Sequence, residues 1–180
     1  MKRRTHAALR GEFFLRDGTP AMIWSLLPTD AETLREGFRQ LSHDSRRHRF
    51  LTAIDELDDA MIRRLVDSVD GAQHIALLLM VLTPEGEEGP AGVGHLVFCP
   101  DDPATADIAV TVADDWQGRG VGTALRAALL ARRPAAVKRL RTVVDADNHA
   151  SLALLAGAGR MSARPDSPGV LEVTVELAAA

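Results

Sequence analysis

The stretch Asp107–Thr123, which reads DIAVTV-ADDW-QGRGVGT, decides the fold of this chain of 180 residues. We expect a β-strand at its start and a helix from Gly120 onward, joined by a turn that contains Gly118, Gly120 and Gly122. Glycine permits positive φ angles and lets the backbone approach a ligand without an intervening Cβ. Successive N–H groups in such a turn, together with the helix N-terminus, bind anions. The turn therefore predicts a phosphate or pyrophosphate ligand, with Arg119 as an added positive charge.

Two other glycine-rich phosphate loops are excluded by their spacing. A dinucleotide-binding loop has Gly-x-Gly-x-x-Gly after the first parallel strand of a domain, whereas this turn has Gly-x-Gly-x-Gly late in the chain. A kinase-type phosphate loop needs Gly-Lys-Ser/Thr, which the turn lacks. The turn is therefore expected to be a phosphate-binding loop of a different fold.

The periodicity of the remaining sequence predicts one α+β domain over residues 19–178, preceded by an N-terminal arm over residues 1–18. Short polar loops between successive apolar runs favour antiparallel neighbours, and the later strand–helix–strand unit requires local parallel pairing. Strands are expected at 21–27, 75–82, 92–98, 107–112, 140–144 and 170–177, and helices from Thr29 or Asp30 to Leu41, from Asp58 to Val69, and at 120–133 and 150–158.

The composition is that of a globular protein without a membrane or nucleic-acid role. The apolar fraction is 46%, the charged fraction is 26% and the formal net charge is −4, so no whole-molecule attraction to nucleic acid or anionic lipid is expected. No apolar run approaches the roughly 20 residues of a membrane span, and the basic start Met1–Arg4 is not followed by the apolar run of a signal peptide. A single cysteine, Cys99, fits a reducing compartment. A cytoplasmic location is predicted.

The pattern Gln117-x-x-Gly120-x-Gly122 follows one strand and precedes another that ends near Asn148. In this context it resembles the GNAT superfamily of N-acetyltransferases, and the resemblance covers most of the chain, most strongly from Asp107 to Gly159. It implies a three-layer α+β fold, with a mixed, mostly antiparallel sheet and helices on both faces. It also implies that the strands at 107–112 and 140–144 splay apart, so that a thioester enters the gap.

The resemblance further implies that acetyl-CoA is the cosubstrate. The backbone of two strand residues would pair with the pantetheine arm and polarise the thioester carbonyl, the turn would wrap the pyrophosphate, and two residues at the start of the later short helix would contact the far side of the arm. The strand residues are Val110 and Val112, and the helix-start residues are Asn148 and Ser151. The turn residues are Gln117, Gly118, Arg119, Gly120, Val121, Gly122 and Thr123.

Acetyl transfer to an amine requires a proton acceptor. A lysine-like amine with a pKa near 10.4 is neutral about once in a thousand molecules at pH 7.4, and only the neutral form attacks a thioester. Asp107 is the candidate base, because it opens the strand that should carry the thioester and matches an acidic position of the family. The alternative is that Asp107 only ends the preceding turn. The family often protonates the thiolate with a tyrosine at the place of Leu155, and this chain has no tyrosine.

The basic stretch Ser42–Phe50 is similar to a segment of bacterial protein-lysine acetyltransferase domains that borders the acceptor side. It contains His43 and His48, yet their spacing suits neither one helical face nor a strand, so a solvated loop without metal is expected. The resemblance implies an acetyl-CoA-dependent N-acetyltransferase for a primary amine, for which a protein lysine is one candidate. The other reading is a non-catalytic acyl-CoA-binding module, which acts as a sensor or subunit. A homodimer is a family-based expectation.

Overall fold

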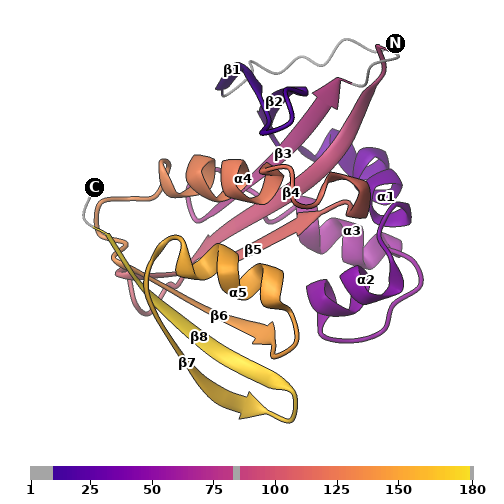
Figure 1. Cartoon of the computed structure of the whole chain (residues 1–180). Helices are drawn as coiled ribbons and strands as arrows, with labels where there is room; N and C mark the ends of the chain where they lie inside the picture. Colours follow the sequence, from indigo (N-terminus) through magenta and orange to yellow (C-terminus); the bar gives the residue numbers. More distant parts are fainter. Residues whose placement is uncertain (1–9, 83–85, 179–180) are drawn as a thin grey trace.

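The computed structural model describes residues 10–82 and 86–178, which form one eight-stranded sheet between two layers of helices (Figure 1). The strands lie in the order β1-β2-β3-β4-β5-β6-β8-β7, and only β5 and β6 run parallel. The strands are β1 (Arg10–Phe14), β2 (Pro20–Ser25), β3 (His74–Leu82), β4 (Glu88–Phe98), β5 (Thr105–Val112), β6 (Arg139–Asp145), β7 (Gly159–Ser167) and β8 (Val170–Leu177); the helices are α1 (Ala31–Arg39), α2 (His43–Phe50), α3 (Asp59–Val66), α4 (Val121–Leu130) and α5 (His149–Ala156).

The central strand β3 is covered on both faces, which explains its continuous apolar sequence. Alternate residues of a strand point to opposite faces. Leu77 and Leu79 belong to the core under α4, whereas Leu78 and Met80 belong to the core under α1 and α3. The α+β class and the two covered faces predicted by the sequence are confirmed.

Helix α4 packs closely on β4 because two glycines leave room for it. A Cβ on Gly92 would lie 2.9 Å from Val121 Cγ1, and one on Gly94 would lie 2.8 Å from Leu129 Cδ1. Real Cβ atoms do not approach other carbon atoms so closely, so larger residues here would push α4 outward. The glycines of β4 thus fix the position of α4, whose N-terminus carries the glycine turn.

The strands β5 and β6 separate after a short stretch of pairing. Their register contains only Thr105 opposite Arg139 and Ala106 opposite Leu140. Beyond these pairs, the hydroxyl of Thr142 donates a hydrogen bond of 3.3 Å to the carbonyl of Ile108. The splayed strand pair expected from the sequence is therefore present.

Three segments differ from the sequence prediction. The expected arm contains β1, which pairs with β2, while residues 1–9 of that arm lie outside the described part. The expected basic loop is the helix α2, and the chain from Gly159 to Ser167 forms the unpredicted strand β7. No helix in the described part of the chain is both long and apolar enough to cross a membrane.

Candidate active site

Beyond Ala106, the edge of β5 that faces β6 has no strand partner in the described part of the protein. The N–H of Ala113 donates to the carbonyl of Ala91 on the β4 side, at 3.0 Å. Because successive residues of a strand alternate, the backbone groups of Val112 and Val110 point the other way, toward the gap. The carbonyl of Val112 indeed accepts a bond from the side chain of Gln117 in that gap, at 3.4 Å. An extended ligand could pair with this edge as an additional strand would.

The glycine turn lies directly beyond this edge, and its backbone conformation depends on glycine. Gly118 has φ +73° and Gly120 has φ +98°, both in the left-handed region that side chains disfavour. Space is open around Gly118, where a Cβ would meet nothing within 4 Å. Gly120 is the N-cap of α4 and provides no side-chain cap, so the first amides of α4 are available to an anion. This cradle fits a pyrophosphate.

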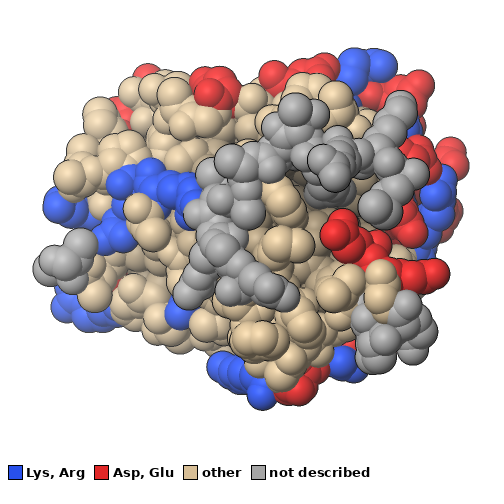
Figure 2. All heavy atoms as spheres, turned by 90° about the horizontal axis from the view of Figure 1, so that it is seen from above, with Lys and Arg blue, Asp and Glu red and all other residues tan. Residues whose placement is uncertain are grey.

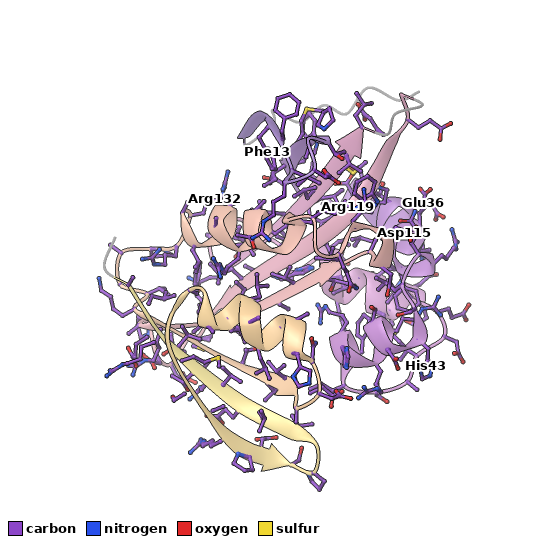
Figure 3. The ribbon with its side chains drawn as sticks, viewed as in Figure 1. Phe13, Glu36, His43, Asp115, Arg119 and Arg132 are labelled. Carbon is purple, nitrogen blue, oxygen red and sulfur yellow. The ribbon has the colours of Figure 1, made fainter. Side chains whose placement is uncertain are left out.

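Arg119 is held by the turn between β1 and β2. Its Nη1 lies 3.1 Å from Asp17 Oδ2, and its guanidinium stacks 4.8 Å from the ring centroid of Trp116 (Figure 3). The backbone N–H of Arg16 donates to the Arg119 carbonyl at 3.1 Å, and the Arg16 side chain passes beside Gly120. Hydrogen bonds from Thr19, followed by the Arg119 contact, hold the pKa of Asp17 below its usual value. The sequence predicted that the positive charge of Arg119 would act on the ligand. In the structure, Asp17 neutralises part of that charge.

We expect Arg119→Ala to weaken acetyl-CoA binding only several-fold at low salt, because Asp17 already offsets part of its charge. The difference from the unchanged protein should disappear near 1 M salt, where exposed charges are screened. Calorimetric titration at two salt concentrations measures this. Unchanged affinity at low salt would mean that the side chain takes no part and that the backbone alone binds the pyrophosphate.

The start of α2 is hydrogen-bonded to the segment that follows β5. Asp114 accepts from Ser42 N at 2.9 Å, from Ser42 Oγ at 2.8 Å and from Ser45 Oγ at 2.9 Å. Gln117 Nε2 in turn donates to Ser45 Oγ at 3.2 Å. Partial burial would raise the pKa of Asp114, yet these hydrogen bonds outweigh it and keep the pKa below its usual value. Asp114 thus stays ionised and ties α2 to the glycine turn.

The other end of α2 reaches the far strand of the splayed pair. Arg47 contacts Asp145, the last residue of β6, and also Asp147 at 2.8 Å, while His48 Nε2 lies 3.0 Å from Asp147 Oδ1. The hydrogen bond from Arg47, and then that from His48, lowers the pKa of Asp147. Helix α2 therefore connects β5 and β6 where they separate.

His48, Asp145 and Asp147 have the donor atoms of a metal site within 4.8 Å of one another. The guanidinium of Arg47 lies between the two carboxylates and 3.0 Å from His48 Nε2, so a divalent ion would have to displace it. His43, the other histidine considered from the sequence, lies 3.9 Å from Asp44 and away from this group. The expectation that the protein uses no metal stays a prediction.

Asp107, the candidate base, lies exposed in β5 on the face that α2 approaches. Its carboxylate is close enough to Arg49 of α2 for an electrostatic attraction. Burial lowers the pKa of the Arg49 guanidinium, and Asp107 offsets part of this effect. Asp107 is therefore on the same strand as the backbone groups of Val110 and Val112, with a solvent path for a proton.

The remaining predicted residues lie at the starts of α4 and α5. Asn148 caps α5, because its Oδ1 accepts from the N–H of Ser151 at 3.0 Å. Thr123 is exposed in the first turn of α4. Leu155, at the place of the family tyrosine, is buried in the core and only 4% exposed, so it offers no proton.

Four polar residues near the gap were not predicted from the sequence, namely Asp114, Arg49, His95 and Thr111. Asp114 bonds to Ser42, and Arg49 interacts with Asp107. Each pair is more than 55 positions apart in the chain, so local sequence patterns give no sign of the contact. His95 and Thr111 lie on the helix-covered face of β4 and β5, where period-two alternation marks both as inward-facing polar residues. This alternation could have identified His95 and Thr111 from the sequence.

Basic and acidic side chains are spread over the face seen from above (Figure 2). Acidic groups gather on the right of this view, on the side of α1, and basic groups lie mainly on the left. The basic side chains of the described residues that are visible on this face are interrupted by uncharged and acidic ones.

Comparisons with known proteins agree with this geometry. Residues 40–159 match the model of the acetyltransferase (GNAT) family, which is more than half of the chain. An acetyltransferase of Pseudomonas aeruginosa is 32% identical over 166 residues, which cover 89% of this chain and 87% of that protein. Acetyltransferase Pat of Mycolicibacterium smegmatis is 30% identical, and the match covers 91% of this chain but 47% of that protein.

The structural comparison gives the same fold. The GNAT domain of S. lividans PAT superposes with a TM-score of 0.74 at 23% identity, covering 96% of this chain and 97% of that domain. A cAMP-binding acyltransferase from Mycobacterium smegmatis superposes with a TM-score of 0.60 at 22% identity, over 93% of this chain and 47% of that one. From the family match, the relatives and the splayed strand pair, we conclude that the chain belongs to the GNAT family of acetyltransferases.

Proposed function

We propose that the protein is an N-acetyltransferase that transfers the acetyl group of acetyl-CoA to a primary amine. The observation that supports this most directly is the open edge of β5, which is followed, after the short 3-10 turn Asp114–Trp116, by the glycine turn at the start of α4. A pantetheine arm along Val110 and Val112 would place its pyrophosphate at Gln117–Thr123. Asn148 and Ser151 would lie on the far side of the same arm.

The proposed reaction needs two contributions from the chain. The neutral amine nitrogen attacks the thioester carbon, a C–N bond forms, the C–S bond breaks and coenzyme A leaves as thiolate. Backbone N–H groups at the open edge would stabilise the negative charge that develops on the carbonyl oxygen. Asp107 would take the amine proton, directly or through water. The thiolate leaves without a protein acid, which its thiol pKa near 8.5 permits.

The acceptor we infer is an alkyl amine, for which a protein lysine is the first candidate. Support comes from the stretch Ser42–Phe50, which contains α2 and lies beside the gap, on the side where an acceptor would enter. The relative named Pat is also an acetyltransferase, although the chain spans only 47% of it. A cytoplasmic location and a homodimer stay predictions.

The second candidate is a module that binds acyl-CoA without turnover. The absence of tyrosine and the burial of Leu155 favour it, because no side chain at that place can protonate the thiolate. Asp107 and the open edge favour the enzyme, since an attacking ammonium needs more help than a leaving thiolate.

A thiol-release screen separates the two candidates. Protein lysines, N-terminal peptides, aminoglycosides, polyamines and amino acids are each mixed with acetyl-CoA and the protein, and free coenzyme A thiol is measured. The enzyme predicts release that depends on one class of amine. Acetyl-CoA binding without amine-dependent release from any class would favour the binding module.

A further inference from the structure

The turn between β1 and β2 holds Arg16 next to the glycine turn at the start of α4. The N–H of Leu15 donates to the carbonyl of Thr19 at 2.9 Å, and the N–H of Gly18 donates to the carbonyl of Leu15 at 3.0 Å. Leu15 is also buried in the core under α4, with only 6% of its surface exposed. The turn is therefore fixed by its own hydrogen bonds and by a buried side chain, and the backbone bond from Arg16 to Arg119 joins it to the glycine turn.

The side chain of Arg16 runs along Gly120, the N-cap of α4. From the position that a Cβ on Gly120 would take, Arg16 Cγ lies 3.3 Å away, and Cδ and Nε each lie 3.6 Å away. Nε belongs to the guanidinium, so the positive charge itself lies beside the N-cap. The N-terminus of a helix carries the positive end of its dipole, which favours anions and disfavours cations. Arg16 thus adds positive charge to a place that is already electropositive.

Arg16 lacks the counter-charge that its neighbour Arg119 has. Asp17 Oδ2 lies 3.1 Å from Arg119 Nη1, and Asp17 Oδ1 accepts from the N–H of Thr19 at 3.0 Å. Arg119 is further engaged by the ring of Trp116. Among the described residues, no carboxylate forms an ion pair with Arg16, whose side chain is exposed. The charge that remains for a ligand at this helix end is therefore mainly that of Arg16, a residue of the hairpin turn.

We propose that Arg16 binds the pyrophosphate of coenzyme A and supplies more of the side-chain charge in the cofactor site than Arg119 does. The inference rests on the proposed function, because it takes the glycine turn as the pyrophosphate site. It adds a residue from another part of the chain, since the match to the family model begins at residue 40. A guanidinium presents its N–H groups in a planar fork, which can bond two phosphate oxygens at once.

A bound pyrophosphate would neutralise two positive groups that the fold already holds together. These groups are the N-terminal end of α4 and the guanidinium of Arg16, and both attract an anion. The hairpin turn is bonded to the glycine turn in the protein alone, so the backbone is in place before the ligand binds. Since Arg16 is exposed, water and salt screen part of the attraction, and the effect on affinity should depend on salt.

Calorimetric titration with coenzyme A tests this proposal without acetyl transfer. Arg16→Gln removes the charge and keeps a polar side chain. It should weaken coenzyme A binding about tenfold at low salt, at the lower end of what a hydrogen bond to a charged group contributes, because the site is exposed. This loss should exceed that of Arg119→Ala, and most of it should disappear near 1 M salt. Unchanged affinity of a folded Arg16→Gln protein at low salt would overturn the proposal.

Two further variants separate a direct contact from a general effect of charge. Lysine keeps the charge but not the planar fork, so the affinity of Arg16→Lys should lie between those of Arg16→Gln and the unchanged protein. Arg63 is exposed in α3, on the opposite side of the sheet from α4, and Arg63→Gln makes the same change in net charge. It should bind coenzyme A like the unchanged protein. Equal losses in Arg16→Gln and Arg63→Gln would contradict a contact with Arg16.

The analogue 3′-dephospho-coenzyme A identifies the phosphate that Arg16 contacts. It lacks the phosphate on the ribose and keeps the pyrophosphate, so Arg16→Gln should weaken its binding by the same factor as that of coenzyme A. A loss that disappears with the analogue would place Arg16 at the ribose phosphate and contradict the proposal. Failure of the unchanged protein to bind coenzyme A would contradict the proposed function together with this inference. Normal binding that depends on Arg16, without transfer to any amine, would contradict the proposed function alone.

Discussion

Replacing Asp107 by asparagine should lower turnover about 10²–10⁴-fold near pH 7, with acetyl-CoA affinity nearly unchanged. Asparagine keeps the size and polarity of the side chain but cannot accept a proton. The loss corresponds to about 2.7–5.4 kcal/mol of activation free energy. It should become smaller as pH rises, because the neutral amine then forms without help. Initial rates of thiol release between pH 7 and pH 10 measure the effect.

Asp101→Asn is the matched control, because Asp101 is an exposed aspartate in the turn before β5. Its rate should equal that of the unchanged protein at each pH. Wild-type turnover of Asp107→Asn at pH 7 would exclude the base role and leave a proton path through bulk water. A loss of equal size at every pH would indicate instead a damaged acceptor site.

Gly120→Val should weaken acetyl-CoA binding by well over tenfold, or at least about 1.4 kcal/mol. Gly120 has φ +98°, and a valine there must either strain the backbone or alter the turn. A Cβ there would also lie 3.3 Å from Cγ of Arg16, so the valine would crowd the Arg16 side chain beside the turn where the pyrophosphate is proposed to bind. Titration calorimetry gives the affinity, and circular dichroism checks the fold.

Gly169→Val separates this effect from backbone strain. Gly169 has φ +77° in the turn between β7 and β8, and a Cβ there meets nothing within 4 Å. The valine should lower stability by a comparable amount and leave acetyl-CoA affinity unchanged. If a folded Gly120→Val protein bound acetyl-CoA normally, the pyrophosphate would not lie at the glycine turn.

The parts of the fold that the sequence predicted are those with strong local patterns. The apolar run of β3 and the amphipathic α1 and α3 could be recognised because burial repeats with the period of the element. Helix α2 could not, because it buries no residue and is held by Asp114, Asp145 and Asp147 from distant parts of the chain. Its Ser42 cap alone is a weak signal. Strand β7 is largely exposed and contains Pro165, so it lacks the alternation of a covered strand.

The residues of the candidate site also fall into two groups, those with a local sequence pattern and those that depend on distant contacts. The glycine turn and Asp107 could be proposed as site residues because motif and chemistry lie close together in the sequence. The pairing of Arg119 with Asp17 could not be anticipated, since it joins residues 102 positions apart. The hydrogen bond between His74 and His95 likewise depends on strand register, which places both residues on one face of the sheet. Such contacts are properties of the tertiary structure.

Transfer of an isotopically labelled acetyl group tests the central claim most directly. The protein is incubated with coenzyme A that carries a ¹³C-labelled acetyl group and with a lysine-containing peptide, and the products are analysed by mass spectrometry and NMR. The proposed function predicts that the label appears as an amide on a peptide nitrogen, with one free thiol for each amide formed, and that Asp107→Asn slows its appearance. Label that stays on coenzyme A, or appears only as free acetate, with this peptide and with each amine of the thiol-release screen would contradict an N-acetyltransferase.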